Sequence, residues 1–119
     1  MGVIWRVLQS RQVTEWLDNV SSETYADVAA AIDVLQGAGP ALRRPLVGSI
    51  VGSRYHNMKE LRPPSLGASE VRILFAFDLQ RHAILLLAGD KAGQWDKWYR
   101  RAVPQADDMF EAHLRGEDV

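Results

Sequence analysis

Four cations, Lys59, Arg62, Arg72 and Lys91, lie at the ends of apolar segments or interrupt them. A long cationic side chain in an apolar strand is rarely buried alone, because an unpaired buried charge is costly. Arg72 is therefore expected either to pair with a carboxylate, for which Glu60 is the obvious candidate, or to open onto a site. Such cations on one surface would suit the binding of a polyanion.

Metal chemistry is not predicted. His56, His82 and His113 show no useful ligand spacing, and no group of carboxylates indicates a magnesium site. The chain has no cysteine, which excludes disulfides, thiol catalysis and cysteine-based zinc sites. The lack of cysteine also favours a reducing cytoplasm as the location. We therefore predict no metal and no other cofactor.

Three consecutive strands, expected at 55–61, 70–78 and 83–88, must position these cations. The second strand is rich in β-branched and aromatic residues, which favour sheets. The third strand is a continuous apolar run, which predicts that both of its faces are covered and that it is central in its sheet. Pro63 and Pro64 separate the first two strands, because proline cannot donate to a sheet ladder. The three strands are expected to form an antiparallel meander.

The alternation of side chains along a strand predicts which cations share a face. Lys59 and Leu61 should project to one face of their strand. The opposite face should carry His56, Met58, Glu60 and Arg62. Arg72 should share a face with Leu74 and Ala76.

The other elements predict an α+β domain that spans residues 1–119 without a linker. A strand is expected at 3–8, one or two helical turns at 12–17, and an amphipathic helix that Ser21 or Ser22 caps and that Gly37 and Gly39-Pro40 end. Residues 41–52 are expected to form a loop. A helix is expected at 94–102, and Pro104 should interrupt it before a last helix that ends at Gly116.

The charge distribution is uneven. The chain has 119 residues and a net charge of −1, but residues 43–101 contain 11 Lys and Arg against 5 Asp and Glu, a balance of +6. A basic centre between acidic ends suits a surface that faces a polyanion. The alternative is that these charges only keep a small domain in solution. No signal peptide or membrane-spanning segment is predicted.

The order of elements and three segments resemble the HigB-like branch of the RelE/ParE toxin superfamily, which belongs to type II toxin–antitoxin systems. The segments are Lys59-Glu60-Leu61-Arg62, Arg72-Ile73-Leu74-Phe75 and Gly89-Asp90-Lys91. The resemblance implies a RelE-like small antiparallel β-sheet packed against two N-terminal helices and one or more C-terminal helices. It also implies a ribosome-dependent, metal-independent endonuclease of messenger RNA that inhibits translation. The implied partners are the ribosome, mRNA and a helix-turn-helix antitoxin, through which the toxin would reach operator DNA only indirectly.

Metal-free RNA cleavage suggests roles for the cations. The 2′-hydroxyl of the RNA attacks the adjacent phosphorus, so the protein must manage two protons and stabilise the phosphorane. We assign Arg62 and Arg72 as phosphate clamps, Lys59 as base or electrostatic stabiliser, and Lys91 as phosphate contact or acid. The remaining candidates are His56 as an alternative base and Arg43, Arg44, Arg54 and Tyr99 as RNA contacts.

Each assignment has a structural alternative. Arg62 and Arg72 could form salt bridges with Glu60 or another acid, Lys59 could be a solvated edge residue, and Tyr99 could belong to the core. Two other functions also stay open. One is a ParE-like inhibitor of DNA gyrase, and the other is an inactive RNA-binding domain of the same fold.

Overall fold

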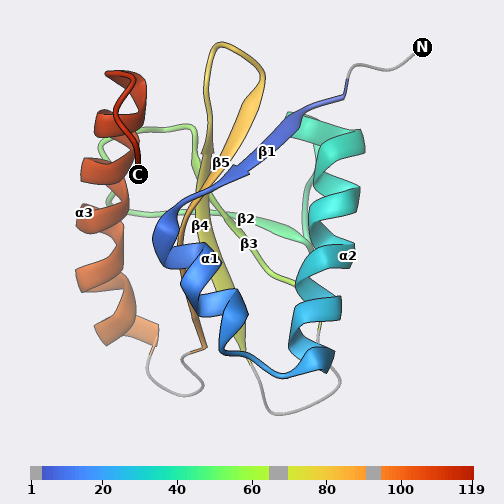
Figure 1. Ribbon diagram of the computed structural model, residues 1–119. Helices are drawn as coiled ribbons and strands as arrows, with labels where there is room; N and C mark the ends of the chain where they lie inside the picture. The colour runs from blue at the N-terminus through green and yellow to red at the C-terminus, as the bar shows by residue number, and fades with distance from the viewer. Residues whose placement is uncertain (1–3, 65–69, 91–94) are drawn as a thin grey trace.

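Three layers make up the molecule, a central sheet with two helices on one face and one helix on the other (Figure 1). The computed structural model describes residues 4–64, 70–90 and 95–119. The α+β class and the packing of two N-terminal helices and a C-terminal helix on the sheet are confirmed. No helix in the described parts of the chain is long and apolar enough to span a membrane.

The sheet has five strands in the order β1-β5-β4-β3-β2. They are β1 (Arg6–Gln9), β2 (Val47–Ser49), β3 (Met58–Leu61), β4 (Val71–Phe77) and β5 (His82–Asp90). The strands β3, β4 and β5 form the predicted antiparallel meander, and β5 has a neighbour on both sides. The sheet is mixed, because β1 pairs with β5 in parallel. The chain forms helices and three other strands between β1 and β5, and so long a connection permits either strand direction.

The first face of the sheet is covered by α1 (Arg11–Asp18) and α2 (Ser22–Ala38), which is followed by the short 3-10 helix η1 (Gly39–Ala41). Val13 and Leu17 of α1 and Val28, Ala31 and Leu35 of α2 bury their side chains there against β3, β4 and β5. Ser21 caps α2, as its sequence allowed, and accepts a hydrogen bond from the backbone N–H of Thr24. We call this side of the sheet the α1/α2 face.

The opposite side, the α3 face, is covered by α3 (Trp95–Leu114). The prediction that Pro104 separates two helices is wrong, because Pro104 lies inside α3. Ala102, Val103 and Ala106 on both sides of this proline are buried on the sheet. Pro104 itself is exposed, so water can reach the carbonyl of Arg100 that loses its helical partner. Burial of one continuous apolar face thus keeps the helix intact.

The expected loop at 41–52 contains a short strand, β2, which pairs with β3 at the edge of the sheet. Three residues with a glycine in the middle carry no clear strand pattern, so pairing with β3 decides this element. The loop after β2 is held to α3 by Asp107. The buried carboxylate of Asp107 accepts hydrogen bonds from Ser53 Oγ (2.5 Å) and from the Arg54 backbone N–H (2.8 Å).

Candidate functional site

A buried carboxylate, that of Glu60 on β3, organises the cations on the α3 face. The Glu60 side chain is 1% exposed, and its Oε1 accepts hydrogen bonds from Arg62 Nε (2.6 Å) and lies 2.6 Å from Arg62 Nη2. The Arg72 Nε lies 3.8 Å from the same oxygen. The second oxygen, Oε2, accepts a hydrogen bond from the Tyr99 hydroxyl (2.5 Å). We call these four residues the Glu60 cluster.

The sheet register brings the two arginines together. Glu60 pairs with Leu74 across β3 and β4, and Arg72 lies two residues before Leu74 on the same face. Gly48 of β2 pairs with Glu60 on the other side. A Cβ at Gly48 would lie 2.7 Å from Arg62 Nη2 and 2.8 Å from Arg62 Cζ. The Arg62 guanidinium therefore lies in the space that a side chain at position 48 would fill.

Tyr99 reaches this cluster from α3. Burial of its phenol, together with the hydrogen bond to Glu60 and the negative charge of Glu60, raises the pKa of Tyr99 from 10.0 to about 12. The positive charges of Arg72 and Arg62 lower it, but by less. Tyr99 is thus a hydrogen-bond donor at neutral pH and cannot act as a base there.

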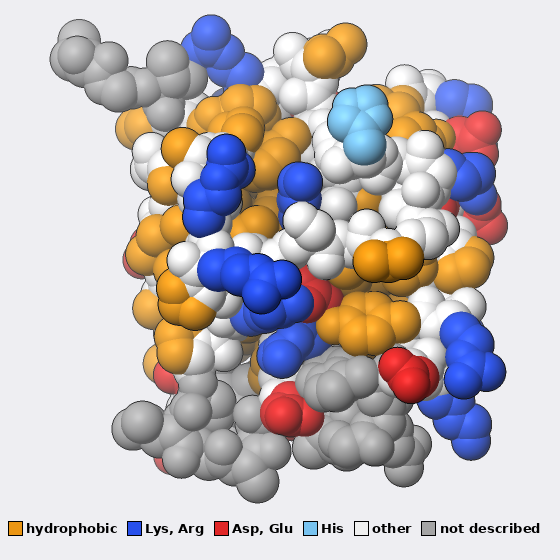
Figure 2. Space-filling view, turned by 180° about the vertical axis from the view of Figure 1, so that it is seen from behind, with side chains coloured by type: hydrophobic (Ala, Val, Ile, Leu, Met, Phe, Trp, Pro, Cys, Tyr) orange, Lys and Arg blue, Asp and Glu red, His pale blue; other side chains and the backbone are white. Residues whose placement is uncertain are grey.

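A cavity of about 310 Å³ opens beside the cluster, and Figure 2 shows Lys and Arg side chains gathered around an acidic side chain on this side of the molecule. The cavity is lined by Ser49, Ile50, Val51, Glu60, Arg62, Asp96 and Tyr99. The side chains of Arg62 and Arg72 are 30% and 22% exposed, so both guanidinium groups are held by the protein and still reach solvent. The Glu60 cluster itself, with two cations and one buried carboxylate, carries a net positive charge, and Asp96 adds a second carboxylate at the wall of the cavity. Guanidinium groups bind phosphate with paired N–H donors.

Lys59 does not join this cluster. It projects to the α1/α2 face, as its position beside Leu61 predicted, whereas Glu60 and Arg62 project to the α3 face. There it lines a different cavity, of about 350 Å³, with Arg43 and Arg44. The sheet itself therefore separates Lys59 from Arg62 and Arg72, because neighbouring residues of a strand point to opposite faces.

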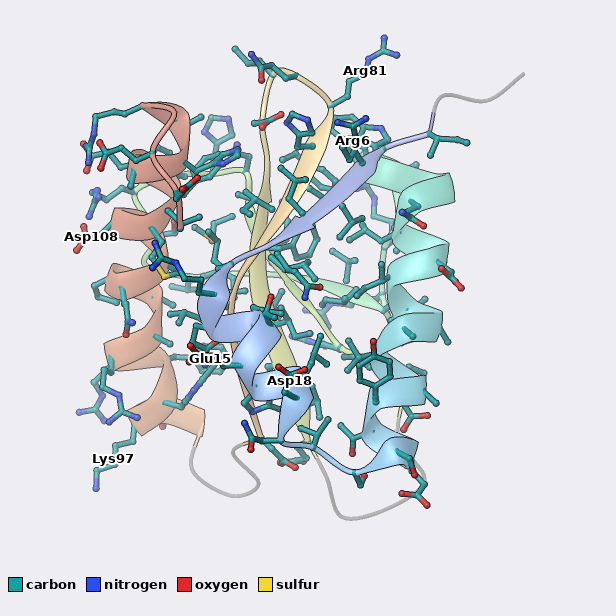
Figure 3. The ribbon with its side chains drawn as sticks, viewed as in Figure 1. Arg6, Glu15, Asp18, Arg81, Lys97 and Asp108 are labelled. Atoms are coloured by element: carbon teal, nitrogen blue, oxygen red, sulfur yellow. The ribbon has the colours of Figure 1, made fainter. Side chains whose placement is uncertain are left out.

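The other predicted site residues are spread over the surface. His56 is exposed in the turn before β3, and no contact within the described ranges joins it to the Glu60 cluster. Arg54 forms ion pairs with Asp108 (3.1 Å) and Glu111 (3.3 Å) of α3, and the hydrogen bond to Asp108 raises its pKa. Lys97 projects away from the sheet at one end of α3 (Figure 3). Lys91 lies outside the described residues.

The expectation for the histidines is wrong. His82 of β5 and His113 of α3 meet at the carboxylate of Asp78, which follows β4. Asp78 Oδ2 lies 2.9 Å from His82 Nδ1 and 2.8 Å from His113 Nε2. His113 is 31 residues beyond His82 in the chain, so only the packing of α3 on the sheet brings the rings together.

Two features of the site were not predicted. The contact between Tyr99 and Glu60 joins residues 39 positions apart, and the sequence contains no periodic pattern that connects them. Gly48 lay in a segment that was expected to be a loop. In contrast, the pairing of Arg72 with Glu60 was proposed from the cost of an unpaired charge in an apolar strand, and the structure bears out their proximity.

The model of the family described as phage derived protein Gp49-like (DUF891) matches residues 15–111. The chain is 56% identical over 103 residues to a Mycobacterium tuberculosis protein named "Putative toxin HigB2", and the match covers 87% of this chain but 51% of that protein. The chain thus spans about half the length of that relative. It is 48% identical over 106 residues to "Putative toxin HigB3" of the same organism, with 89% of this chain and 90% of that protein covered.

A solved structure shares the fold. It is a chain in the crystal structure of the archaeal RelE–RelB complex from Pyrococcus horikoshii, with a TM-score of 0.57 and 17% sequence identity. The match covers 76% of this chain and 98% of that chain. The chain therefore belongs to the Gp49-like family and to the HigB-like branch of the RelE/ParE superfamily that its sequence resembles.

Proposed function

We propose that this chain is the toxin of a type II toxin–antitoxin module and that it cleaves messenger RNA on the ribosome. Family membership and the names of the two relatives support the toxin assignment. The observation that carries the RNA assignment is the convergence of Arg62, Arg72 and Tyr99 on Glu60 beside an open cavity. An antitoxin with a helix-turn-helix domain would hold the toxin inactive, and the cytoplasm would be its place of action.

The proposed reaction is a transesterification within the RNA. The 2′-oxygen forms a bond to the adjacent phosphorus and loses its proton to a base. The bond between phosphorus and the 5′-oxygen breaks, and the 5′-oxygen takes up a proton. The products are a 2′,3′-cyclic phosphate and a 5′-hydroxyl end, so no oxidant or second substrate is needed.

Arg62 and Arg72 would stabilise the charge that develops on the phosphorane oxygens. Their guanidinium groups are already oriented by Glu60, so little reorganisation is needed when the phosphate binds. Glu60 is then a positioning residue, because its side chain is buried and both of its oxygens already accept hydrogen bonds. The Tyr99 hydroxyl already donates its single hydrogen to Glu60 Oε2, so the Tyr99 ring would contribute by stacking on a base of the bound RNA.

Two groups are proposed for the proton transfers, His56 and Lys91. His56 is exposed before β3, and imidazole is the side chain most often used for proton transfer in catalysis. Lys91 follows Asp90, the residue that pairs with Val71 beside Arg72. Lys59 is not part of this proposal, because it projects to the α1/α2 face. With Arg43 and Arg44 it would attract ribosomal RNA through non-specific electrostatics.

The test is brief expression of the chain in growing cells, followed by mapping of the 5′ ends of messenger RNAs. New ends inside translated regions are expected with the wild-type chain. Arg72→Ala removes one of the two proposed phosphate-binding arginines and should reduce the yield of new 5′ ends by a factor of about 100 or more. Arg11→Ala is the matched control, since Arg11 is an exposed arginine at the start of α1. Lys59→Ala should cleave much more strongly than Arg72→Ala.

Three outcomes contradict the proposal in different ways. Equal yields from folded Arg72→Ala and from Arg11→Ala would remove Arg72 from the site. Growth arrest with intact messages would exclude RNA cleavage and favour inhibition of DNA gyrase. Normal growth with intact messages would leave a domain of this fold without toxin activity.

A further inference from the structure

We propose that Asp78, His82 and His113 form a binding site for a divalent transition metal of the zinc type, which links the turn between β4 and β5 to the end of α3. The three ligand atoms, one carboxylate oxygen and two ring nitrogens, lie within 4.8 Å of one another. The site is separate from the Glu60 cluster and does not depend on the proposed RNA cleavage.

The ligand set selects the class of metal. Two imidazole nitrogens and one carboxylate oxygen suit zinc and its neighbours in the first transition row, whereas magnesium and calcium prefer oxygen ligands alone. In a tetrahedral zinc site with bonds of about 2.1 Å, neighbouring ligand atoms are about 3.4 Å apart. The present separations from Asp78 Oδ2 are 2.9 Å to His82 Nδ1 and 2.8 Å to His113 Nε2. Metal binding thus requires each ring nitrogen to move away from Asp78 Oδ2 by about 0.5 Å.

The carboxylate is oriented before any metal binds. Its other oxygen, Asp78 Oδ1, accepts hydrogen bonds from the backbone N–H groups of Gln80 (2.8 Å) and His82 (2.9 Å). These contacts hold Oδ2 toward the two rings, and such outer contacts to ligands are typical of metal sites.

The histidine rings are oriented by the same packing that forms the core. The His113 ring stacks on Phe110, one turn earlier in α3, with centroids 6.1 Å apart and an interplanar angle of 18°. Phe110 is buried between α3 and the sheet. His82 begins β5, and its ring stands at 79° to that of His113. Their positions are thus determined by β5 and α3, which gives the precision that a metal site needs.

A path for the metal is present. A cavity of about 520 Å³ reaches the site and is lined by Leu8, Asp78, Leu79, Gln80, His113, Leu114, Gly116, Glu117 and Asp118. Arg81 of the neighbouring turn points away from the molecule (Figure 3), so its charge does not lie over the ligands. A water molecule in this cavity would provide the fourth ligand of a tetrahedral ion.

The test uses the full chain, purified under denaturing conditions without an affinity tag and then refolded. Titration with zinc chloride in a calorimeter should show one ion per chain and raise Tm by about 5 °C or more at saturation. Magnesium chloride should do neither. Cobalt(II) should give the visible absorption of a tetrahedral ion.

The variants locate the site. His113→Gln and His82→Gln should lose the zinc signal and the cobalt spectrum. His56→Gln, which changes the third histidine of the chain, should keep both. Asp78→Asn keeps the size of the ligand and serves as the second variant if either histidine variant fails to fold. The proposal is overturned if zinc does not bind the wild-type chain, or if it binds His113→Gln and His56→Gln equally well.

Discussion

The Tyr99 hydroxyl on α3 donates a hydrogen bond to Glu60 Oε2 on β3, and this contact joins the C-terminal helix to the sheet at the arginine cluster. The other carboxylate oxygen, Glu60 Oε1, accepts a hydrogen bond from Arg62 and lies near Arg72. One buried carboxylate therefore sets the positions of the two guanidinium groups and of the phenol. The arrangement makes the site and the stability of the fold depend on the same residue.

Glu60→Ala is expected to lower the free energy of unfolding by about 3 kcal/mol, because it leaves Arg62 and Arg72 without their shared, buried counter-charge. Urea unfolding followed by circular dichroism measures the change. Glu15→Ala is the control, since Glu15 is an exposed acid on α1 (Figure 3), and it should change stability by about 0.5 kcal/mol or less. A similar small change in Glu60→Ala would show that the pairing contributes no stability.

Tyr99→Phe is expected to remove the tyrosinate transition that has its midpoint near pH 12 in the wild-type chain. Because the folded-state pKa is raised from 10.0, the neutral phenol contributes stability that is fully present below pH 10. That contribution is lost as the pH rises from 10 to about 12. Absorbance at the tyrosinate band measures the titration, and Tyr25→Phe is the control. Persistence of the transition near pH 12 in Tyr99→Phe would assign it to another tyrosine.

Gly48→Ala is expected to displace the Arg62 guanidinium, because the new Cβ would lie 2.7 Å from Arg62 Nη2. The side chain can move, so the loss of stability should be about 1 kcal/mol, while mRNA cleavage should fall strongly. Gly37→Ala is the control, since no atom lies within 4 Å of a Cβ there and α2 should become more stable. Unchanged cleavage by Gly48→Ala would show that the Arg62 position is not critical.

Asp107→Ala is expected to destabilise the fold by about 2 kcal/mol, because it leaves the Arg54 backbone N–H and the Ser53 hydroxyl without their acceptor. The neighbouring Asp108→Ala removes only a solvent-exposed ion pair with Arg54 and should destabilise the fold much less. Thermal unfolding of the two variants side by side measures the difference. Equal Tm values would show that the buried carboxylate does not hold the loop after β2.

Local patterns in the sequence were enough to predict the three meander strands, the amphipathic helix α2 and the faces of β3 and β4. These features depend on local periodicity, and a buried face requires side chains of one kind at every second or every third to fourth position. The same alternation placed Lys59 opposite Arg62. The cost of an unpaired charge in an apolar strand pointed to Glu60 as the candidate partner of Arg72. The family could also be predicted from the sequence, because the segments around Lys59, Arg72 and Gly89 follow one another in the order found in HigB-like toxins.

Contacts between residues far apart in the chain could not be predicted from local patterns. The parallel pairing of β1, the short strand β2 and the unbroken helix through Pro104 depend on partners far along the chain, and burial against them outweighs local preference. For the same reason Tyr99 reaches Glu60, and His113 reaches His82 and Asp78. Both contacts are made when α3 docks on the sheet, and the apolar residues that drive this docking carry no information about the polar groups that it brings together.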